Sequence, residues 1–381
     1  MAMSQTTLRE YLTRANPTLE RPQGQLSMRV KSCTRGREYP TPMKILPWKE
    51  FNTSTILRLF DQELSKILNK PFDNLHDFSH LHQSSRKIYN EKSLEALLIK
   101  SNHSIVLEAL ERTTQSLLKQ EVLMVRGDQA RIIYAPASSP DWAGLSTVQK
   151  DNNILPGDTK LSRNWRSKEI KTNVRSTGEI KTEHTAPLIW PIRQLFHYCI
   201  QSHTRYGYLI TDEELVVFRV GLSEKEQIPN SSPKELRETV ADKGIVEWKA
   251  IPWENHGHGN KITVNLALWA LHILAANNGL LNWKYQRLEE ETLVEPETQQ
   301  KLTNEPTSFS TDGVQSQQPM QQMSPKSSTT DELQNTQDES FEDHNVFTSF
   351  ASTRSRASNA SMKRKGRSGS CSSRKRQKRS M

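Results

Sequence analysis

The chain has 381 residues, of which 34% are hydrophobic, and its mean hydropathy is −0.74. This length accommodates one large or two small domains, but the low apolar content predicts that part of the chain cannot be packed. The most apolar run, residues 262–276, contains Asn265 and His272 and is too short and too polar to span a bilayer. Three scattered cysteines exclude a cysteine-based zinc cluster and a disulfide framework, so we expect a soluble protein of a reducing, intracellular compartment.

Charge is distributed unevenly along the chain, although the whole carries a formal charge of +9. Residues 351–381 contain 11 Lys and Arg and no acidic residue, whereas residues 289–350 contain 13 acidic residues and 2 Lys. Residues 1–288 are therefore also basic, which suits a polyanionic partner. Because large apolar side chains are few, we expect an acidic, Gln/Ser/Thr-rich disordered segment over 289–350 and a basic disordered tail over 351–381.

The N-terminal region is polar and contains four prolines, so we expect residues 1–44 to form a flexible arm. Within it, the stretch from Gln5 to Leu12 resembles the sliding-clamp-binding box of replication and repair proteins. That box ends in two aromatic residues, whereas this stretch ends in Tyr11 and Leu12. An ordinary short amphipathic turn is the alternative interpretation.

Two amphipathic helices are predicted next. Apolar residues recur at helical spacing over residues 49–68 and again over residues 104–118. In the second helix, Glu111 falls at the edge of the buried face, whereas Glu108 points further toward water. An acid at that edge is well placed to reach a neighbouring active site, although Glu111 can equally be solvated.

The rest of the chain up to residue 288 alternates short strands with two further helices. Apolar runs separated by turn residues indicate these elements. We expect strands over residues 122–125, 130–134, 142–148, 154–160, 208–211, 215–220 and 245–251, and helices over residues 192–203 and 263–276.

Two of these strands carry candidate catalytic residues. Asp141 precedes the strand over 142–148, and Asp158 and Lys160 end the next strand. Residues i and i+2 of a strand share a face, so Asp158 and Lys160 point the same way, and Asp141 enters the same pocket if the two strands are neighbours. Two carboxylates that hold a divalent cation, with a lysine beside them, are the minimal set for metal-assisted phosphodiester hydrolysis. The alternative is a common Pro-Asp turn and a chance Asp-x-Lys spacing.

The connection after Lys160 is long, polar and basic. It holds Arg163, Trp165, Arg166 and Lys168 close together. Basic side chains beside an aromatic ring suit a nucleic-acid clamp, because the charges contact phosphates and the ring stacks on a base. A solvated loop without a ligand is the competing interpretation.

A polar pair, Gln194 and Tyr198, lies four residues apart on one face of the helix over residues 192–203. In this pair and in three short segments, the chain resembles the fungal PD-(D/E)XK nuclease-like proteins of the restriction-endonuclease-like superfamily. The segments are Pro140 to Gly144, Gly157 to Lys160 and Arg205 to Tyr208.

The resemblance covers about residues 50–285 and implies a fold and a set of roles. The fold is α/β (α+β), with a restriction-endonuclease-like αβββαβ core, N-terminal helices and a domain over residues 45–288. The implied roles are binding of Mg²⁺ or Mn²⁺ by Asp141 and Asp158, orientation of water by Lys160, the first-helix acid at Glu111, and flanking of the nucleic acid by Gln194 and Tyr198.

The function implied is metal-dependent phosphodiester hydrolysis of nucleic acid, with DNA rather than RNA as the expected partner. Asp158 stands where this family usually has glutamate, and the superfamily contains members that have kept the fold without catalysis. A catalytically inactive scaffold that binds nucleic acid or protein is therefore the alternative. Nothing in the chain supports a kinase, since it has no Gly-rich phosphate loop and no His-Arg-Asp or Asp-Phe-Gly motif.

Two basic clusters near the C-terminus, residues 363–365 and 374–379, are separated by a Ser/Gly-rich spacer. This pattern resembles a bipartite nuclear import signal, so we expect a nuclear protein with a nuclear import receptor as a partner. A general nucleic-acid-binding tail is the alternative. We expect no membrane partner.

Overall fold

The computed structural model describes residues 6–21, 39–73, 75, 81–136, 138–181, 188–226, 231–257, 259, 261–278, 281, 283–284 and 287–295. All of them belong to one compact unit, residues 1–309. Within these ranges no helix is both long and apolar enough to cross a membrane. The acidic segment beyond Glu295, the basic tail and its import signal lie outside the described residues.

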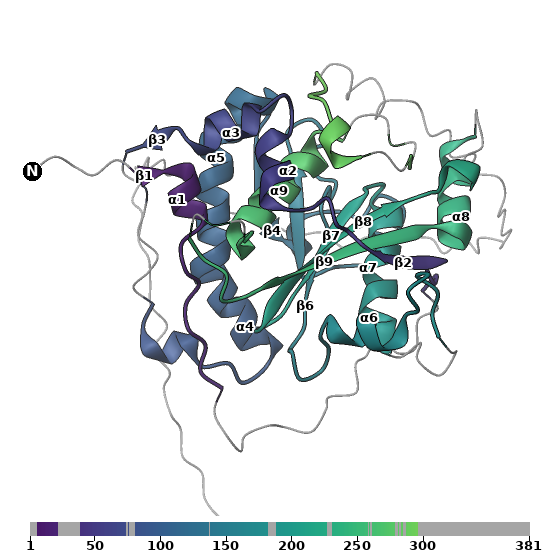
Figure 1. Cartoon of the computed structure of the whole chain (residues 1–381), viewed down its shortest axis with the longest axis horizontal. Coiled ribbons are helices and arrows are strands. Elements are labelled where there is room, and N and C mark those ends of the chain that lie inside the picture. The colour runs from purple at the N-terminus through teal and green to yellow at the C-terminus, as the bar shows by residue number, and fades with distance from the viewer. Residues whose placement is uncertain are drawn as a thin grey trace, which may run out of the picture. The chain divides into compact units, whose positions relative to one another are not determined.

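A seven-stranded mixed sheet forms the centre of the fold (Figure 1). Its strands in chain order are β2 (Lys44–Pro47), β4 (Val122–Arg126), β5 (Trp142–Ser146), β6 (Gly157–Thr159), β7 (Tyr206–Ile210), β8 (Glu214–Gly221) and β9 (Ile245–Pro252). Their order across the sheet is β2-β9-β8-β7-β6-β5-β4. β6 runs parallel to β7, and β2 runs parallel to β9, whereas all other neighbours are antiparallel. The predicted mixture of helices and strands is confirmed.

Alternating side chains of the central strands feed two separate cores, because successive residues of a strand point to opposite faces. In β8, Leu215 and Val217 belong to one apolar cluster, whereas Val216, Phe218 and Val220 belong to the other. Both faces of this strand are therefore buried, which explains its nearly continuous apolar sequence.

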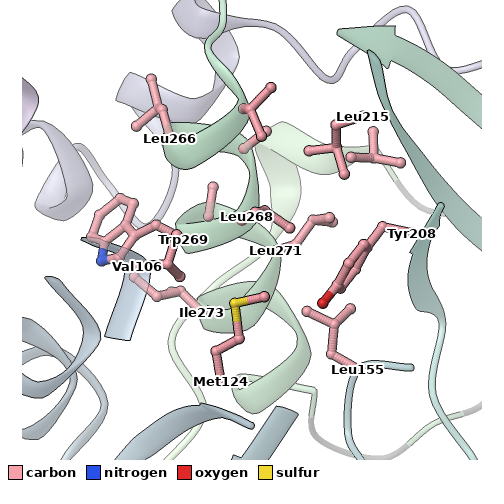
Figure 2. Close-up of a cluster of buried hydrophobic side chains, with 14 of the residues drawn as sticks. Val106, Met124, Leu155, Tyr208, Leu215, Leu266, Leu268, Trp269, Leu271 and Ile273 are labelled. Carbon is pink, nitrogen blue, oxygen red and sulfur yellow. The ribbon is translucent and has the colours of Figure 1, made fainter. Parts of the chain in front are cut away.

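Helices cover both faces of the sheet (Figure 1). The first face packs against α1 (Leu8–Leu12), α2 (Thr53–Arg58), α3 (Glu63–Leu68), α4 (Glu91–Leu98), α5 (Ser104–Leu118) and α9 (Val264–Ala276). The second face packs against α6 (Lys168–Asn173), α7 (Trp190–Gln201) and α8 (Pro233–Lys243). Figure 2 shows the centre of the first core, where side chains of α9 meet Val106 of α5, Met124 of β4, Tyr208 of β7 and Leu215 of β8.

Several predicted elements differ in detail from those observed. The single helix expected over 49–68 is split into α2 and α3, because residues 60–62 adopt positive φ angles between 54° and 68°. The strand expected over 130–134 is reduced to one bridge between Arg131 and Asn152. The helix over 104–118 is confirmed as α5, but it continues from α4 through a π-helical turn at Ile99–His103.

The N-terminal segment is part of the fold, so the prediction of a flexible arm over residues 1–44 is wrong for residues 6–21. β1 (Thr6–Thr7) pairs with β3 (Pro71–Phe72), and Thr7 caps α1 with a capping box. Leu8, Tyr11 and Leu12 are completely buried in the first core. These are side chains that a sliding-clamp-binding box would have to expose, so clamp binding would require this segment to undock.

The C-terminal boundary of the domain also lies beyond residue 288. Leu288 is completely buried, and Glu291 accepts hydrogen bonds from Arg205 and from the hydroxyl of Tyr206, both at 3.3 Å. The Asn277 side chain holds the backbone of residues 292 and 294 through two hydrogen bonds. The folded domain therefore also includes residues 289–295, which we expected to begin the disordered acidic segment.

Helix α9 is buried on every side, and it contains His272. The Nδ1–H group of His272 donates to the carbonyl of Leu268 at 2.8 Å, and Nε2 is buried without a hydrogen-bond partner. Burial lowers the pKa of His272 to about 4. The neutral imidazole therefore stabilises the fold fully above pH 6.5, the unfolded value, and this contribution is lost as the pH falls toward 4.

Protonation of His272 alone should lower the free energy of unfolding by about 3 kcal/mol between pH 7 and pH 4. Denaturant titrations at pH 7, 5.5 and 4 should show a shallower pH dependence for His272→Leu, which keeps a similar volume and cannot titrate. His256→Asn, at an exposed histidine, is the control variant for the same titrations. An identical slope in wild type and His272→Leu would refute the assignment.

Candidate active site

Strands β5 and β6 bring Asp141 to the second predicted aspartate. Trp142 lies opposite Gly157 in the antiparallel pair, so the residue before β5 reaches the end of β6. The backbone N–H of Thr159 donates to Asp141 Oδ2 at 2.7 Å. The Trp142 indole donates to Thr159 Oγ1 at 2.8 Å on the other side of the sheet. Asp141 is thus held in place by the backbone of the strand that carries Asp158.

Asp158 and Lys160 share a face, as the strand spacing predicts. Their side chains form an ion pair, and only 5% of the Asp158 side chain and 17% of the Lys160 side chain are exposed. The Lys160 backbone N–H donates to the carbonyl of Ile210, which extends the parallel pairing of β6 with β7 by one residue. The structure therefore brings Asp141, Asp158 and Lys160 together at one end of β6.

The electrostatics of this cluster are those of groups removed from water. Burial raises the pKa of Asp158 well above its usual value, the Lys160 ammonium offsets part of that increase, and Asp141 adds to it by its charge and by a hydrogen bond between the two carboxyl groups. Burial lowers the pKa of Lys160, but the ion pair with Asp158 and the charges of Asp141 and Glu91 raise it more. Lys160 is accordingly held as a cation, whereas the hydrogen bond between the two carboxyl groups requires that one of them carries a proton.

The predicted first-helix acid is exposed to solvent. Glu111 is exposed on α5, whereas Glu108 is the buried acid of that helix. Glu108 accepts a hydrogen bond from the Tyr11 hydroxyl at 2.7 Å and pairs with Arg112 at 2.8 Å. The sequence prediction exchanged the two positions because it did not include α1, which covers the Glu108 side of α5.

Helix α4 supplies two acids within electrostatic reach of the cluster, and sequence reasoning missed them. Burial raises the pKa of Glu95, and the negative charge of Asp141 is the next largest cause. Glu91, one turn earlier, contributes to the raised pKa of Lys160. Two acids four residues apart, interleaved with buried Leu94 and Leu97, were the signal that could have identified this helix.

Gln194 and Tyr198 lie beside the cluster on the second face of the sheet. Both are buried, and Gln194 Nε2 donates to the Tyr198 hydroxyl at 2.8 Å. Burial raises the pKa of Tyr198, the hydrogen bond from Gln194 lowers it, and the charge of Asp158 raises it further. The predicted pair on α7 therefore lies within electrostatic reach of Asp158.

The predicted nucleic-acid clamp is only partly available for a ligand. Trp165 is 4% exposed in the second core, and its indole donates to the carbonyl of Leu188 at 3.0 Å, so its ring is not exposed for stacking on a base in this structure. Arg163 is half-buried and donates to the carbonyl of Tyr89 at 3.4 Å. Lys168 is exposed at the start of α6.

A cavity of about 710 Å³ lies beside the clamp, and Arg166 and Lys168 contribute to its lining. Arg166 pairs with Glu213 at 3.2 Å. The same glutamate pairs with Arg21 at 2.9 Å, and Arg21 also contacts Asp212 at 2.6 Å. The cations of this cavity are thus largely offset by acids of the same wall, which weakens its attraction for phosphates.

Comparison with known proteins identifies no relative. No family model matches the sequence, and neither the curated proteins nor the solved structures contain a significant match.

Proposed function

We propose that this protein is a metal-dependent nuclease that hydrolyses phosphodiester bonds at Asp141, Asp158 and Lys160. The observation that carries the proposal is the meeting of these three side chains at one end of β6. Asp141 is fixed by the Thr159 N–H group at 2.7 Å, and Lys160 forms an ion pair with Asp158. Charged groups gathered in a largely buried cluster, with a strongly perturbed carboxyl pKa among them, are typical of functional sites.

The order of elements around the cluster supports a restriction-endonuclease-like core. In chain order α5, β4, β5, β6, α7 and β7 follow the pattern αβββαβ, with the short helix α6 inserted between β6 and α7. Asp141 immediately precedes β5, β6 carries Asp158, and α7 carries Gln194 and Tyr198. We propose that Glu95, from α4, takes the role first assigned to Glu111.

The donor set suits Mg²⁺ or Mn²⁺. The two aspartate carboxyl groups are close enough to hydrogen-bond to each other, and as carboxylates they would repel unless a proton or a cation lay between them. Within the described ranges no three His, Cys, Asp or Glu residues gather closely enough to hold a metal. Magnesium is commonly bound by one or two carboxylates, with water and substrate phosphates as the other ligands. When bound, the ion would polarise the phosphodiester and acidify a water molecule.

Side chains and backbone groups of the protein supply the rest of the proposed chemistry. Lys160 places a permanent positive charge beside the scissile phosphate, where negative charge grows in the transition state. Asp158 keeps that ammonium in position, and the Thr159 N–H group fixes the orientation of Asp141. Because the cluster is largely buried, these interactions are stronger than they would be in water.

One observation favours the catalytically inactive scaffold as a second candidate. Asp158 is nearly completely buried, and burial raises its pKa, which favours the neutral acid over the metal-binding carboxylate. Such a site could retain the fold and bind nucleic acid without cutting it.

An assay with purified full-length protein separates the two candidates. Single- and double-stranded DNA and RNA are incubated with Mg²⁺, with Mn²⁺ and with a chelator. The nuclease proposal expects cleavage of DNA that depends on the metal. Binding without cleavage under every condition would support the scaffold.

We further propose nuclear localisation and regulation of nucleic-acid binding by the C-terminal region. Residues 296–350 carry 9 acidic residues against 2 Lys, opposite in sign to the domain. Because this segment is tethered, it can compete with phosphates at an effective concentration in roughly the millimolar range.

A chain ending at Glu295 should therefore bind nucleic acid more tightly than the full chain at low salt. The difference should fade as salt increases, because screening weakens both competitors. Ending the chain at Glu295 keeps the buried Leu288 and the Glu291 contacts. A chain lacking only residues 351–381 is the control, and it should bind more weakly than the full chain. Equal binding of all three chains across salt concentrations would contradict the proposal.

A further inference from the structure

A cluster of aromatic side chains surrounds Tyr39 at the beginning of α7. The Tyr39 ring lies 5.6 Å from that of Trp190 and 5.1 Å from that of His197, measured between ring centroids. It also meets the Tyr198 ring edge-on at 6.4 Å. Trp190 and His197 are only half-buried, so the cluster extends from the core to the surface.

The position of Tyr39 is fixed through its backbone. The Arg193 guanidinium donates two hydrogen bonds to the Tyr39 carbonyl oxygen, one of them at 3.1 Å from Nε. The same guanidinium lies over the Trp190 ring, 4.8 Å from its centroid. Tyr39 is therefore held on α7, although it belongs to the segment that precedes β2 at the far edge of the sheet.

Three buried polar atoms of this cluster have no hydrogen-bond partner. They are the hydroxyl oxygen of Tyr39, Nε1 of Trp190 and Oε1 of Gln194. Tyr39 is 3% exposed and Gln194 is 4% exposed. An unpaired buried polar group costs free energy, so several at one place call for an explanation, and a ligand that supplies the missing partners is one.

These atoms adjoin the candidate active site through Tyr198. The Tyr198 hydroxyl accepts the hydrogen bond from Gln194. Both Tyr39 and Asp158 contribute to the raised pKa of Tyr198, after burial as the main cause. Tyr39 and Asp158 are thus both within electrostatic reach of the Tyr198 hydroxyl, and the Tyr39 ring contacts the Tyr198 ring edge-on.

We propose that Tyr39, Trp190 and Gln194 form a subsite that binds one nucleotide of the substrate strand. This proposal rests on the proposed nuclease function. The Trp190 N–H group donates, the Gln194 oxygen accepts, and the Tyr39 hydroxyl does either. Together they fit a group that presents a donor and an acceptor side by side, as a nucleobase edge and a ribose 2′-hydroxyl both do. The aromatic rings supply apolar surface against which a base can pack.

Tyr39→Phe in the full-length protein tests the subsite, because it removes one hydroxyl and keeps the ring. The probes are fluorescent single-stranded DNA and RNA oligonucleotides of the same mixed sequence, with binding measured in the presence of chelator so that no metal-dependent cleavage occurs. We expect a loss of affinity of about tenfold, typical of one hydrogen bond to a ligand. A loss confined to RNA would identify the 2′-hydroxyl, and a loss on both strands would identify the base edge.

Thermal unfolding of the same variant separates a ligand-binding hydroxyl from a structural one. Because the Tyr39 hydroxyl has no partner in the protein, Tyr39→Phe should unfold at the same temperature as wild type or at a higher one. Tyr134→Phe is the matched control on a half-buried tyrosine packed under Arg237, and it should leave affinity unchanged.

Two results would overturn the subsite while leaving the proposed function intact. One is wild-type affinity of Tyr39→Phe for both oligonucleotides, and the other is a lower unfolding temperature of that variant. If wild-type protein binds neither oligonucleotide and cleaves none in the metal assay, the proposed function and the subsite fail together.

Discussion

Lys160→Ala is expected to reduce metal-dependent cleavage by about 10² to 10³-fold at saturating substrate. Only 17% of the Lys160 side chain is exposed, and its ammonium forms an ion pair with Asp158. Its charge therefore acts on the scissile phosphate with little screening by water. Single-turnover rates with Mg²⁺ and a DNA substrate measure the effect directly.

The control for Lys160→Ala is Lys234→Ala on α8, where 77% of the lysine side chain is exposed. That variant should cleave at the wild-type rate. If Lys160→Ala lowers the cleavage rate by less than tenfold while the control cleaves at the wild-type rate, the catalytic role of Lys160 is refuted.

The variant Asp158→Asn should also abolish cleavage, but we expect it to destabilise the fold more than Lys160→Ala does. Removing the carboxylate leaves the Lys160 ammonium largely buried and unpaired, and breaking such a pair typically costs about 3–5 kcal/mol. Lys160→Ala leaves Asp158 instead, and that acid can take up a proton because burial already raises its pKa. The lysine variant is therefore the cleaner measurement, and unfolding curves of both variants should show this asymmetry.

Local periodicity explains why the centre of the candidate site could be predicted. Asp158 and Lys160 share a face because the repeat of a strand is two residues, and Asp141 joins them because consecutive strands β5 and β6 pair. Gln194 and Tyr198 share a face of α7 for the equivalent reason in a helix. These relations involve neighbours in the chain, so they can be inferred without the tertiary structure.

Long-range packing explains what could not be predicted. Glu108 is buried because α1, which lies 97 residues earlier, places the Tyr11 hydroxyl on it. Trp165 is buried in the second core rather than exposed on the connection. Tyr39 reaches α7 from a segment whose prolines and polarity predicted a flexible arm. Sequence periodicity predicts which residues share a face of a helix or strand. Which distant residues pack against that face depends on the tertiary structure.

Leu12→Ala is expected to lower the free energy of unfolding by about 2–5 kcal/mol, the usual cost of truncating a fully buried leucine. Leu12 is completely buried in the first core. Its carbonyl accepts a hydrogen bond from Thr263 Oγ1 at 2.7 Å, and Thr263 is the N-cap of α9. Leu12→Ala keeps this backbone hydrogen bond and removes only the apolar packing of the side chain in the first core.

Denaturant titration measures the cost, with Thr18→Ala as the control in the same segment. Thr18 is exposed, so its truncation should change the free energy of unfolding by less than about 0.5 kcal/mol. A cost that small for Leu12→Ala as well would show that residues 6–21 are not docked in solution, and the predicted flexible arm would be reinstated. Domains have a total stability of only about 5–15 kcal/mol, so deleting residues 1–14, which removes Leu8, Tyr11 and Leu12 together, should abolish cooperative unfolding.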